Sequence, residues 1–165
     1  MYRLGIYEKA MPESLSLTEK LEAAKRLGFD FAEMSVDESD LKLARLDMPA
    51  RERERLLSAM CRGGIHYESM CLSAHRKYPL GSRDAAARAK SLEIGEKAVV
   101  LARDLGIRMI QLAGYDVYYQ ESGADTAAYF EESLKALTGY ASQYGVVLAF
   151  ETMETPFMNT VKKAM

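Results

Sequence analysis

The chain has 165 residues, of which 48% are hydrophobic and 28% charged, and its formal net charge is -2. This length and composition are typical of a single globular domain with a well-buried core. Lysine and arginine are scattered among acidic residues, so the sequence lacks the basic stripe that binds nucleic acid. No apolar run reaches the roughly 18 to 20 residues that cross a bilayer, and a strand-like segment begins too near the start for a signal peptide. We therefore expect a cytoplasmic protein that binds neither nucleic acid nor membrane.

Short apolar runs typical of strands alternate with amphipathic stretches typical of helices along the whole chain. The predicted strands cover residues 4–7, 31–36, 67–73, 109–114 and 147–151. The helix after the first strand begins with a capping box, Ser16 and Glu19, and an acidic loop follows the second strand. Later helices are predicted from Pro49 in a first turn and from Ser82 and Asp125 as N-caps. Residues 159–165 begin a further helix.

Four of these helices end in the same way, with a glycine, an apolar residue and then a strand. The glycines are Gly28, Gly64, Gly106 and Gly145, spaced 36, 42 and 39 residues apart, which is the length of one helix, one strand and two loops. Repeated βα units need right-handed crossovers and therefore build a parallel sheet with helices outside it.

Such a sheet is either wound on both faces or closed into a barrel. No strand is followed by the GxGxxG phosphate fingerprint, so a barrel is favoured. A (βα)₈ barrel takes about 250 residues, and five strands are too few to close it. The fold class predicted for residues 1–165 is thus α/β, a single domain that forms the N-terminal part of an incomplete barrel. Its open edges and an apolar inner face would be exposed, which favours a homo-oligomer.

Two kinds of residue stand out within this frame. Glu151 is a carboxylate at the exit of an apolar strand, at the sheet edge where α/β enzymes carry out chemistry, although a structural salt bridge would equally explain it. Cys61 and Cys71 have neither metal-site nor disulfide spacing and are expected to be reduced core residues.

The segments LGIYEKA, GFDFAEMSVDESD, SMCLSAHRKYPLGS, IQLAGYDVYYQE and AFETME together resemble the L-ribulose-5-phosphate 3-epimerases, a family of xylose-isomerase-like barrels. These enzymes, also called L-xylulose-5-phosphate 3-epimerases, act in L-ascorbate degradation. The resemblance implies 3-epimerisation of a ketopentose phosphate, from L-xylulose 5-phosphate to L-ribulose 5-phosphate. It also implies one divalent metal ion (Mn²⁺, Mg²⁺, Zn²⁺ or Co²⁺) held by Glu, Asp, His and Glu, of which only Glu151 lies before Met165.

Glu151 would then serve as both metal ligand and catalytic acid or base. Substrate contacts are expected from residues at or just after strand ends, namely Glu33, Ser73, His75 and Arg76. His75 would bind a sugar hydroxyl or order its loop, or would be a surface or supporting histidine. Glu33 would orient substrate or pair with a cation, and Arg76 with its neighbour Lys77 would meet a phosphate. Gln111 and Tyr115 could line the pocket, and Glu154 is a weaker candidate for a second carboxylate.

Three other interpretations were weighed. An apurinic endonuclease of the same superfamily needs histidines at successive strand ends, whereas this chain has only His66 and His75. A hexulose-6-phosphate isomerase would use the same strand-end carboxylates as an epimerase. The third alternative is a catalytically incomplete half-barrel that associates with another copy.

Overall fold

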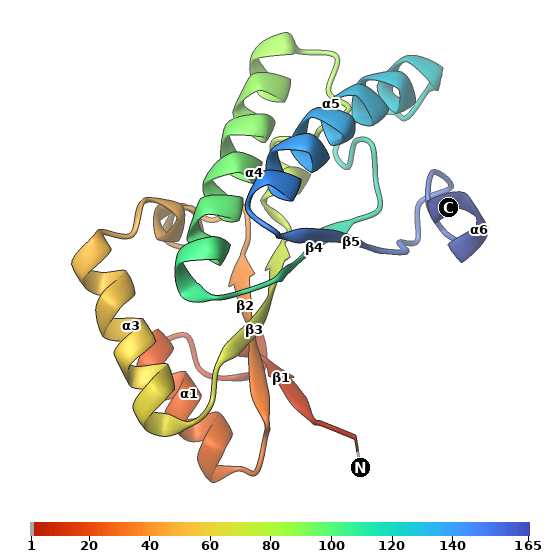
Figure 1. The fold of residues 1–165 in the computed structure, drawn as a ribbon. Helices are drawn as coiled ribbons and strands as arrows, with labels where there is room; N and C mark the ends of the chain where they lie inside the picture. The colour runs from red at the N-terminus through yellow and green to blue at the C-terminus, as the bar shows by residue number, and fades with distance from the viewer. Residues whose placement is uncertain (1) are drawn as a thin grey trace.

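The structure, a computed structural model, describes residues 2–165 as one sheet with helices packed against it (Figure 1). The strands are β1 (Gly5–Tyr7), β2 (Phe31–Val36), β3 (Tyr67–Leu72), β4 (Met109–Ala113) and β5 (Val147–Glu151). The α-helices are α1 (Leu17–Arg26), α2 (Asp40–Leu43), α3 (Ala50–Gly63), α4 (Ala85–Leu105), α5 (Ala124–Gln143) and α6 (Val161–Ala164). Short 3₁₀ helices are η1 (Glu8–Ala10), η2 (Ala44–Asp47) and η3 (Ala74–Arg76). The predicted alternation is confirmed, and α2 lies where only an acidic loop was expected.

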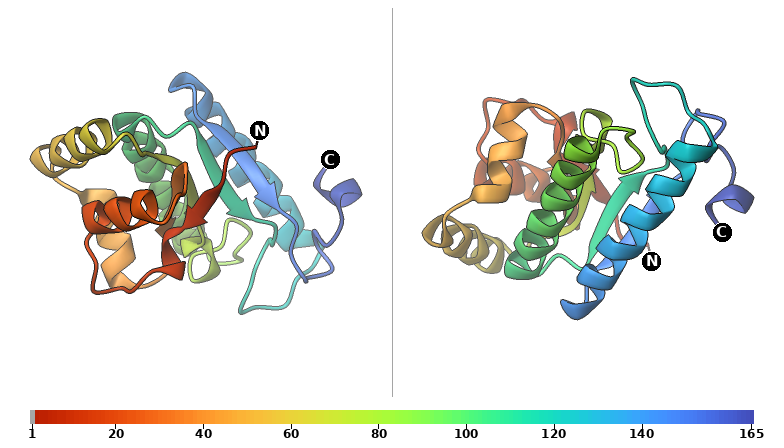
Figure 2. Two further views of the ribbon diagram at one scale, coloured as in Figure 1. Left: turned by 90° about the horizontal axis from the view of Figure 1, so that it is seen from below. Right: turned by 90° about the horizontal axis from the view of Figure 1, so that it is seen from above.

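The sheet is entirely parallel, and its strand order follows the chain, β1-β2-β3-β4-β5. Because the crossovers are right-handed and the strand order never reverses, all the connecting helices lie on one face of the sheet. A doubly wound sheet reverses its order and carries helices on both faces. Figure 2 shows the one-sided helix layer, with α6 apart from it beyond the end of β5. This is the arrangement of part of a (βα)₈ barrel, as predicted.

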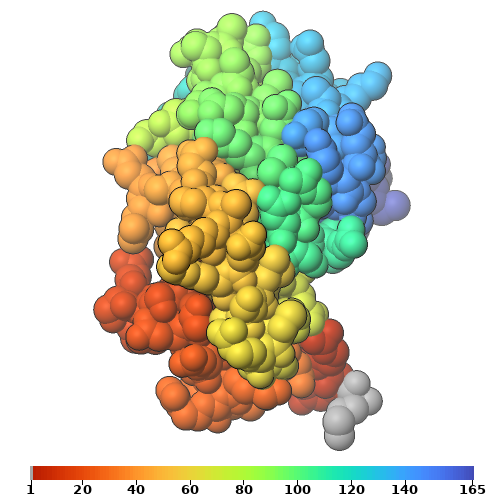
Figure 3. Space-filling view, turned by 60° about the vertical axis from the view of Figure 1, so that its left-hand side comes forward, coloured from red at the N-terminus to blue at the C-terminus, as the bar shows by residue number. Residues whose placement is uncertain are grey.

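The hydrophobic core lies between the helices and the outer face of the sheet. Alternate residues of β2, Ala32, Met34 and Val36, point to this face and are fully buried. Leucine, methionine and alanine side chains of α1, α3, α4 and α5 complete the core. The space-filling view looks onto this helix layer, where α3 and α4 lie next to each other (Figure 3).

The inner face of the sheet, which the helices do not cover, corrects one prediction. Its half toward the carboxyl ends of the strands carries mostly polar side chains, which from β1 to β5 are Tyr7, Glu33, Ser35, Ser69, Cys71, Gln111 and Glu151. Apolar residues, Phe31, Met109 and Val147, occupy its amino half. The expectation of an apolar inner face is therefore wrong for the carboxyl half, because side chains alternate along a strand and the apolar runs carry polar residues at every second position.

The helix ends largely follow the sequence signals. Ser16 Oγ accepts a hydrogen bond from the Glu19 amide and the Glu19 carboxylate accepts one from the Ser16 amide, so the predicted capping box is confirmed. All four repeat glycines have left-handed backbone, with φ between 61° and 86°. Residues with a Cβ rarely adopt this conformation, which explains why glycine ends each helix.

Two predicted N-caps are wrong. The cap of α4 is Asp84, whose carboxylate accepts from the Ala86 amide at 2.8 Å; Ser82 is buried in the preceding turn, where it accepts from the Asp84 amide. Helix α5 begins after Gly123, so Asp125 lies inside its first turn and forms an ion pair with Arg83 instead. In both places another residue of a type common at N-caps lies two positions from the predicted one, namely Asp84 for α4 and Gly123 for α5.

The cysteines also differ from expectation. Both are free, but Cys61 is exposed on α3 and Cys71 is half-buried on the inner face of β3, so neither belongs to the core. Among residues 2–165, no helix combines the length and apolar character needed to cross a membrane.

Candidate active site at the carboxyl ends of the strands

Glu151 lies at the carboxyl end of β5, on the inner face of the sheet. Its backbone pairs with Ala113 of β4, and its Oε2 accepts a hydrogen bond from Gln111 Nε2 at 2.7 Å. The side chain is exposed and forms no ion pair within residues 2–165. Glu151 therefore has no salt-bridge partner among the described residues, which argues against the structural alternative. Its carboxylate is accessible to a ligand.

Glu33 lies deeper on the same inner face. Its Oε2 accepts a hydrogen bond from Ser69 Oγ of the neighbouring strand at 2.6 Å, and no cation pairs with it within the described part of the chain. Farther along β2, Ser35 Oγ accepts a hydrogen bond from the Tyr7 hydroxyl of β1 at 3.1 Å. The polar residues of the inner face thus bind one another across adjacent strands, as a polar pocket lining would.

A hollow of about 420 Å³ lies at the carboxyl ends of β1, β2 and β3. Its lining combines two cations, two acids and two hydroxyls, contributed by Lys9, Asp37, Glu38, Ser39, Ser73 and Arg76. The hollow brings together Ser73 and Arg76, two of the predicted substrate contacts. Lys9 and Ser39 were not predicted, although they follow strand ends in the same way as the residues that were.

The charged groups of this hollow are held in different ways. Lys9 Nζ lies 2.6 Å from Asp37 Oδ2. Partial burial alone would raise the pKa of Asp37, but hydrogen bonds from Lys9 and Ser39 outweigh it and bring that pKa to about 2. Arg76 stacks over the Tyr118 ring at 5.0 Å, its buried Nε has no hydrogen-bond partner, and no carboxylate pairs with it within residues 2–165. Arg76 is therefore the cation of this hollow that is free to meet an anion.

The loop after β4 reaches over to the hollow. Tyr119 donates a hydrogen bond to Glu38 Oε1 at 2.9 Å, and Tyr115 and Tyr118 pack against each other beside it. Tyr115 is 2% exposed, while Tyr119 is 66% exposed. These tyrosines therefore pack within the loop rather than standing free, and Tyr118 also lies against the Arg76 guanidinium.

His75 does not line the hollow. It is buried, and its Nε2 lies 3.2 Å from the carbonyl oxygen of Ser91 in α4. Burial lowers the pKa of His75 to about 4, so the ring is neutral at physiological pH. Among the roles weighed for His75, this placement favours ordering of the loop after β3.

A metal site needs several ligands, and the described residues supply few. No group of three or more His, Cys, Asp or Glu side chains within residues 2–165 is placed to hold a metal ion. Glu154 is exposed in the loop after β5 and forms no side-chain hydrogen bond with Glu151 among residues 2–165. Glu151 alone has the position and the free carboxylate oxygen of a ligand for a hard divalent cation.

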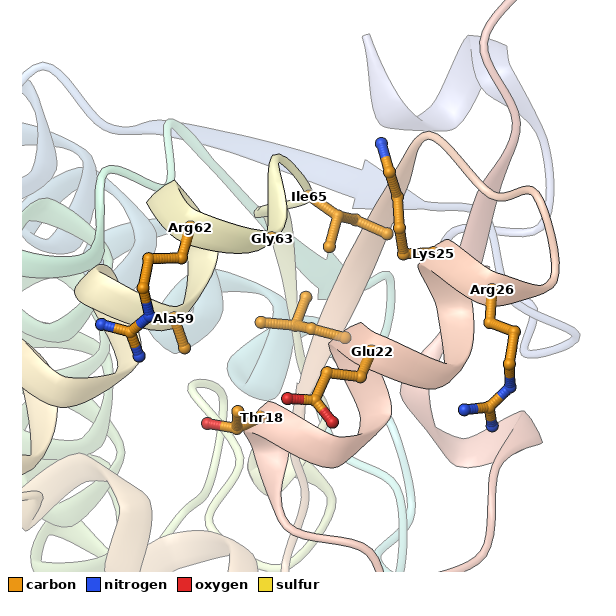
Figure 4. Close-up of a pocket in the computed structure, with 9 residues that line it drawn as sticks. Thr18, Glu22, Lys25, Arg26, Ala59, Arg62, Gly63 and Ile65 are labelled. Carbon is orange, nitrogen blue, oxygen red and sulfur yellow. The ribbon is translucent and has the colours of Figure 1, made fainter.

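A second hollow lies far from the strand ends, between α1 and α3. Its volume is about 440 Å³, and Thr18 and Glu22 of α1 face Ala59 and Arg62 of α3 across it (Figure 4). This groove belongs to the helix layer, where barrels keep residues for stability rather than catalysis.

Comparisons with known proteins agree with this architecture. Residues 21–165 match the family described as xylose isomerase-like TIM barrel. Proteins from Salmonella paratyphi B and Salmonella schwarzengrund, each described as L-ribulose-5-phosphate 3-epimerase UlaE, are 54% identical over 162 residues. The match covers 98% of this chain but 57% of each relative, so the chain spans little more than half their length.

Solved structures share the fold at lower identity. A D-psicose 3-epimerase from Clostridium cellulolyticum H10 superposes with a TM-score of 0.82 at 18% identity, over 98% of this chain and 57% of its own. An L-ribulose 3-epimerase superposes with a TM-score of 0.73 at 23% identity, over 99% of this chain and 55% of its own. The IOLI protein, solved with a bound zinc atom, superposes with a TM-score of 0.76 at 19% identity, over 99% of this chain and 56% of its own. At these identities the likeness establishes the fold.

Proposed function

Because this chain belongs to the xylose isomerase-like TIM-barrel family, we propose that the complete protein is a sugar-phosphate 3-epimerase that interconverts L-xylulose 5-phosphate and L-ribulose 5-phosphate. Residues 1–165 would form the N-terminal part of its barrel. The observation that carries the proposal is Glu151, a carboxylate at the carboxyl end of a barrel strand with no ion-pair partner among residues 2–165, in a chain 54% identical to proteins described as L-ribulose-5-phosphate 3-epimerases.

The proposed reaction removes the proton from C3, next to the carbonyl, and returns a proton to the opposite face of that carbon. Two groups are needed, one on each face, to act as base and acid. Glu151 is one of them, because its carboxylate is exposed on the inner face and its Oε2 is oriented by Gln111. The second group would come from outside this chain.

A cofactor is implied because a carboxylate alone removes such a weakly acidic proton slowly. Glu151 fits as one ligand of a divalent cation, since only one of its oxygens is hydrogen-bonded within the described residues. The bound cation would supply positive charge to the oxygens that become negative as the proton leaves. Glu33 and Ser69 remain candidates to bind sugar hydroxyls deeper on the inner face.

The hollow beside β1, β2 and β3 would hold the phosphate. Arg76 offers a guanidinium with no carboxylate partner within residues 2–165, and Lys9 offers an ammonium that is also paired with Asp37. Ser73 offers a hydroxyl, and Ser39 Oγ would turn to the phosphate from Asp37 Oδ1, to which it donates at 2.6 Å. Phosphate oxygens accept hydrogen bonds from all of these groups. This end of the pocket differs from the site after strands seven and eight that many barrels use for phosphate.

The test is proton exchange in the full-length enzyme. In deuterated water with Mn²⁺, the enzyme should introduce deuterium at C3 of L-xylulose 5-phosphate as L-ribulose 5-phosphate forms, observed by NMR. Glu151→Gln keeps the size of the side chain and should reduce the rate roughly 10²- to 10⁴-fold. Glu132→Gln, at an exposed position of α5 in the helix layer, serves as the control and should retain most activity.

The same spectra separate the alternatives. Exchange at C1 with formation of an aldose would identify an isomerase of the hexulose-6-phosphate type and overturn the epimerase proposal. Full activity of Glu151→Gln would show that another residue is the acid or base.

A further inference from the structure

A buried charge cluster lies directly behind the hollow. Glu8, the first residue after β1, is 0% exposed, and its carboxylate forms ion pairs with Lys20 at 3.1 Å, with Lys42 at 3.3 Å and with Arg45. Its Oε1 also accepts the backbone amide of Ser35 at 2.7 Å. Burial alone would raise the pKa of Glu8, but these cations and the Ser35 amide lower it, so the carboxylate is ionised.

Three partners of Glu8, namely Ser35, Lys42 and Arg45, come from β2 and the segments that follow it, beside the hollow. Strand β1 ends at Tyr7, so the Ser35 amide of β2 has lost its ladder partner and Glu8 takes its place. Arg45 donates both to Glu8 and to the Ser35 carbonyl, which ties η2 to the end of β2. Lys42 belongs to α2, whose N-cap is Ser39, a residue of the hollow. The next residue after Glu8 is Lys9, the ammonium of the hollow.

Lys20 also forms an ion pair with Glu8, but it belongs to an element that does not line the hollow. It is 1% exposed and lies in α1, which contributes no residue to the hollow. Glu8 therefore joins two loops that line the hollow to a helix that does not.

We propose that Glu8 is a positioning residue for anion recognition: its buried carboxylate holds Lys9 and Ser39 in place to bind the phosphate of the substrate. This inference rests on the proposed function for the identity of the substrate. Binding of phosphate at the hollow can nevertheless be measured without turnover.

Charge and position predict opposite effects when Glu8 loses its charge. The cluster holds three cations and one carboxylate, so replacing Glu8 by a neutral residue makes the region more positive and by electrostatics alone would strengthen anion binding. Loss of positioning would weaken it, because a displacement of about 1 Å can reduce a rate or affinity by up to roughly a hundredfold.

The experiment uses the full-length enzyme and its Glu8→Gln variant. Calorimetry measures the Kd of inorganic phosphate, and kinetics measure KM and kcat for L-xylulose 5-phosphate. Positioning predicts that Kd and KM rise roughly ten- to a hundredfold while kcat changes little. A merely structural role would reduce the amount of active enzyme and leave both constants unchanged.

A matched pair keeps the test valid if Glu8→Gln does not fold. Lys42→Met and Lys20→Met each remove one buried ammonium paired with Glu8, so they change the charge equally. Only Lys42→Met releases the helix that carries Ser39, and only it should weaken phosphate binding. Equal effects of the two variants, unchanged constants in Glu8→Gln, or no phosphate binding by the wild type would overturn the inference. Phosphate binding without turnover of L-xylulose 5-phosphate would instead overturn the proposed substrate.

Discussion

Glu8 and Glu151 are both glutamates at the carboxyl end of a strand, yet their surroundings give them different chemistry. Glu8 is fully buried and satisfied by cations and a backbone amide, so it is a structural carboxylate. Glu151 is exposed and, within residues 2–165, accepts a single side-chain hydrogen bond, from Gln111, so its other oxygen is open to a metal ion or a proton. In the sequence both positions follow an apolar run, and the difference arises in the fold, where Lys20, Lys42 and Arg45 from three later segments meet Glu8.

His75 gives a prediction about pH and stability. Its pKa is about 4 in the folded protein against 6.5 for a free histidine, so the unfolded chain binds more protons as the pH falls. The free energy of unfolding is therefore unaffected by His75 above about pH 6.5 and falls progressively as the pH is lowered from about 6.5 to about 4. Between about pH 7 and pH 5, His75 should reduce the free energy of unfolding by about 2 kcal/mol.

The measurement compares urea denaturation of the full-length wild type with that of His75→Gln at both pH values. Glutamine can donate to the Ser91 carbonyl without titrating. The variant should lose about 2 kcal/mol less than the wild type over this range. Identical pH dependence in the two proteins would mean that His75 is not held neutral in the fold.

The elements themselves were largely predictable. The strands are apolar runs, and helices end at glycines such as Gly64 and Gly106. Both signals depend on residues that are close together in the sequence, so they can be recognised without the fold. The N-caps of α4 and α5 were missed because several capping residues stand close together and tertiary contacts choose among them. Helix α2 was missed because four residues are too few to show a helical pattern of apolar positions. The contact that holds it, from Lys42 to Glu8, involves a residue distant in the sequence.

Two glycines inside helices give a prediction about helix packing. Gly139 of α5 has open space where a Cβ would stand, so Gly139→Ala should stabilise the protein by about 1 kcal/mol through helix propensity. Gly95 of α4 faces Leu137 of α5, and an added Cβ would lie 2.7 Å from its methyl carbons. Because Leu137 is buried, Gly95→Ala should destabilise by roughly 1 to 3 kcal/mol despite the same gain in propensity. Thermal unfolding of the two full-length variants measures this difference, and equal stabilisation would show that α4 and α5 separate easily.

At the scale of the whole molecule, the repeat predicted the barrel architecture but not the character of its inner face. The repeat is visible because each βα unit carries its own glycine and strand. The site is less visible because its residues come from several strand ends, and only the register of the sheet brings Gln111 beside Glu151 or Ser69 beside Glu33. Lys9 and Ser39 were missed for the same reason, since their common hollow exists only in the folded sheet.

The open sheet gives the last prediction. Both edge strands, β1 and β5, lack an outer partner in residues 2–165, and Met109 and Val147 pair on the inner face with 46% and 58% of their surfaces exposed. Unpaired edges and exposed apolar residues promote association. Residues 1–165 expressed alone should therefore self-associate in sedimentation experiments and show no metal-dependent exchange at C3.

A matched pair of substitutions tests where association occurs. Val147→Lys places a charge on the edge strand and should shift the equilibrium toward monomer, since lysine on an edge opposes strand pairing. Val161→Lys changes a valine of α6 that is also exposed, to 70%, but is not part of the sheet, and should leave association unchanged. A monomeric parent chain, or equal effects of the two substitutions, would show that the open edge does not drive association. Exchange at C3 by the associated chain would mean that copies of this half-barrel complete one another's site.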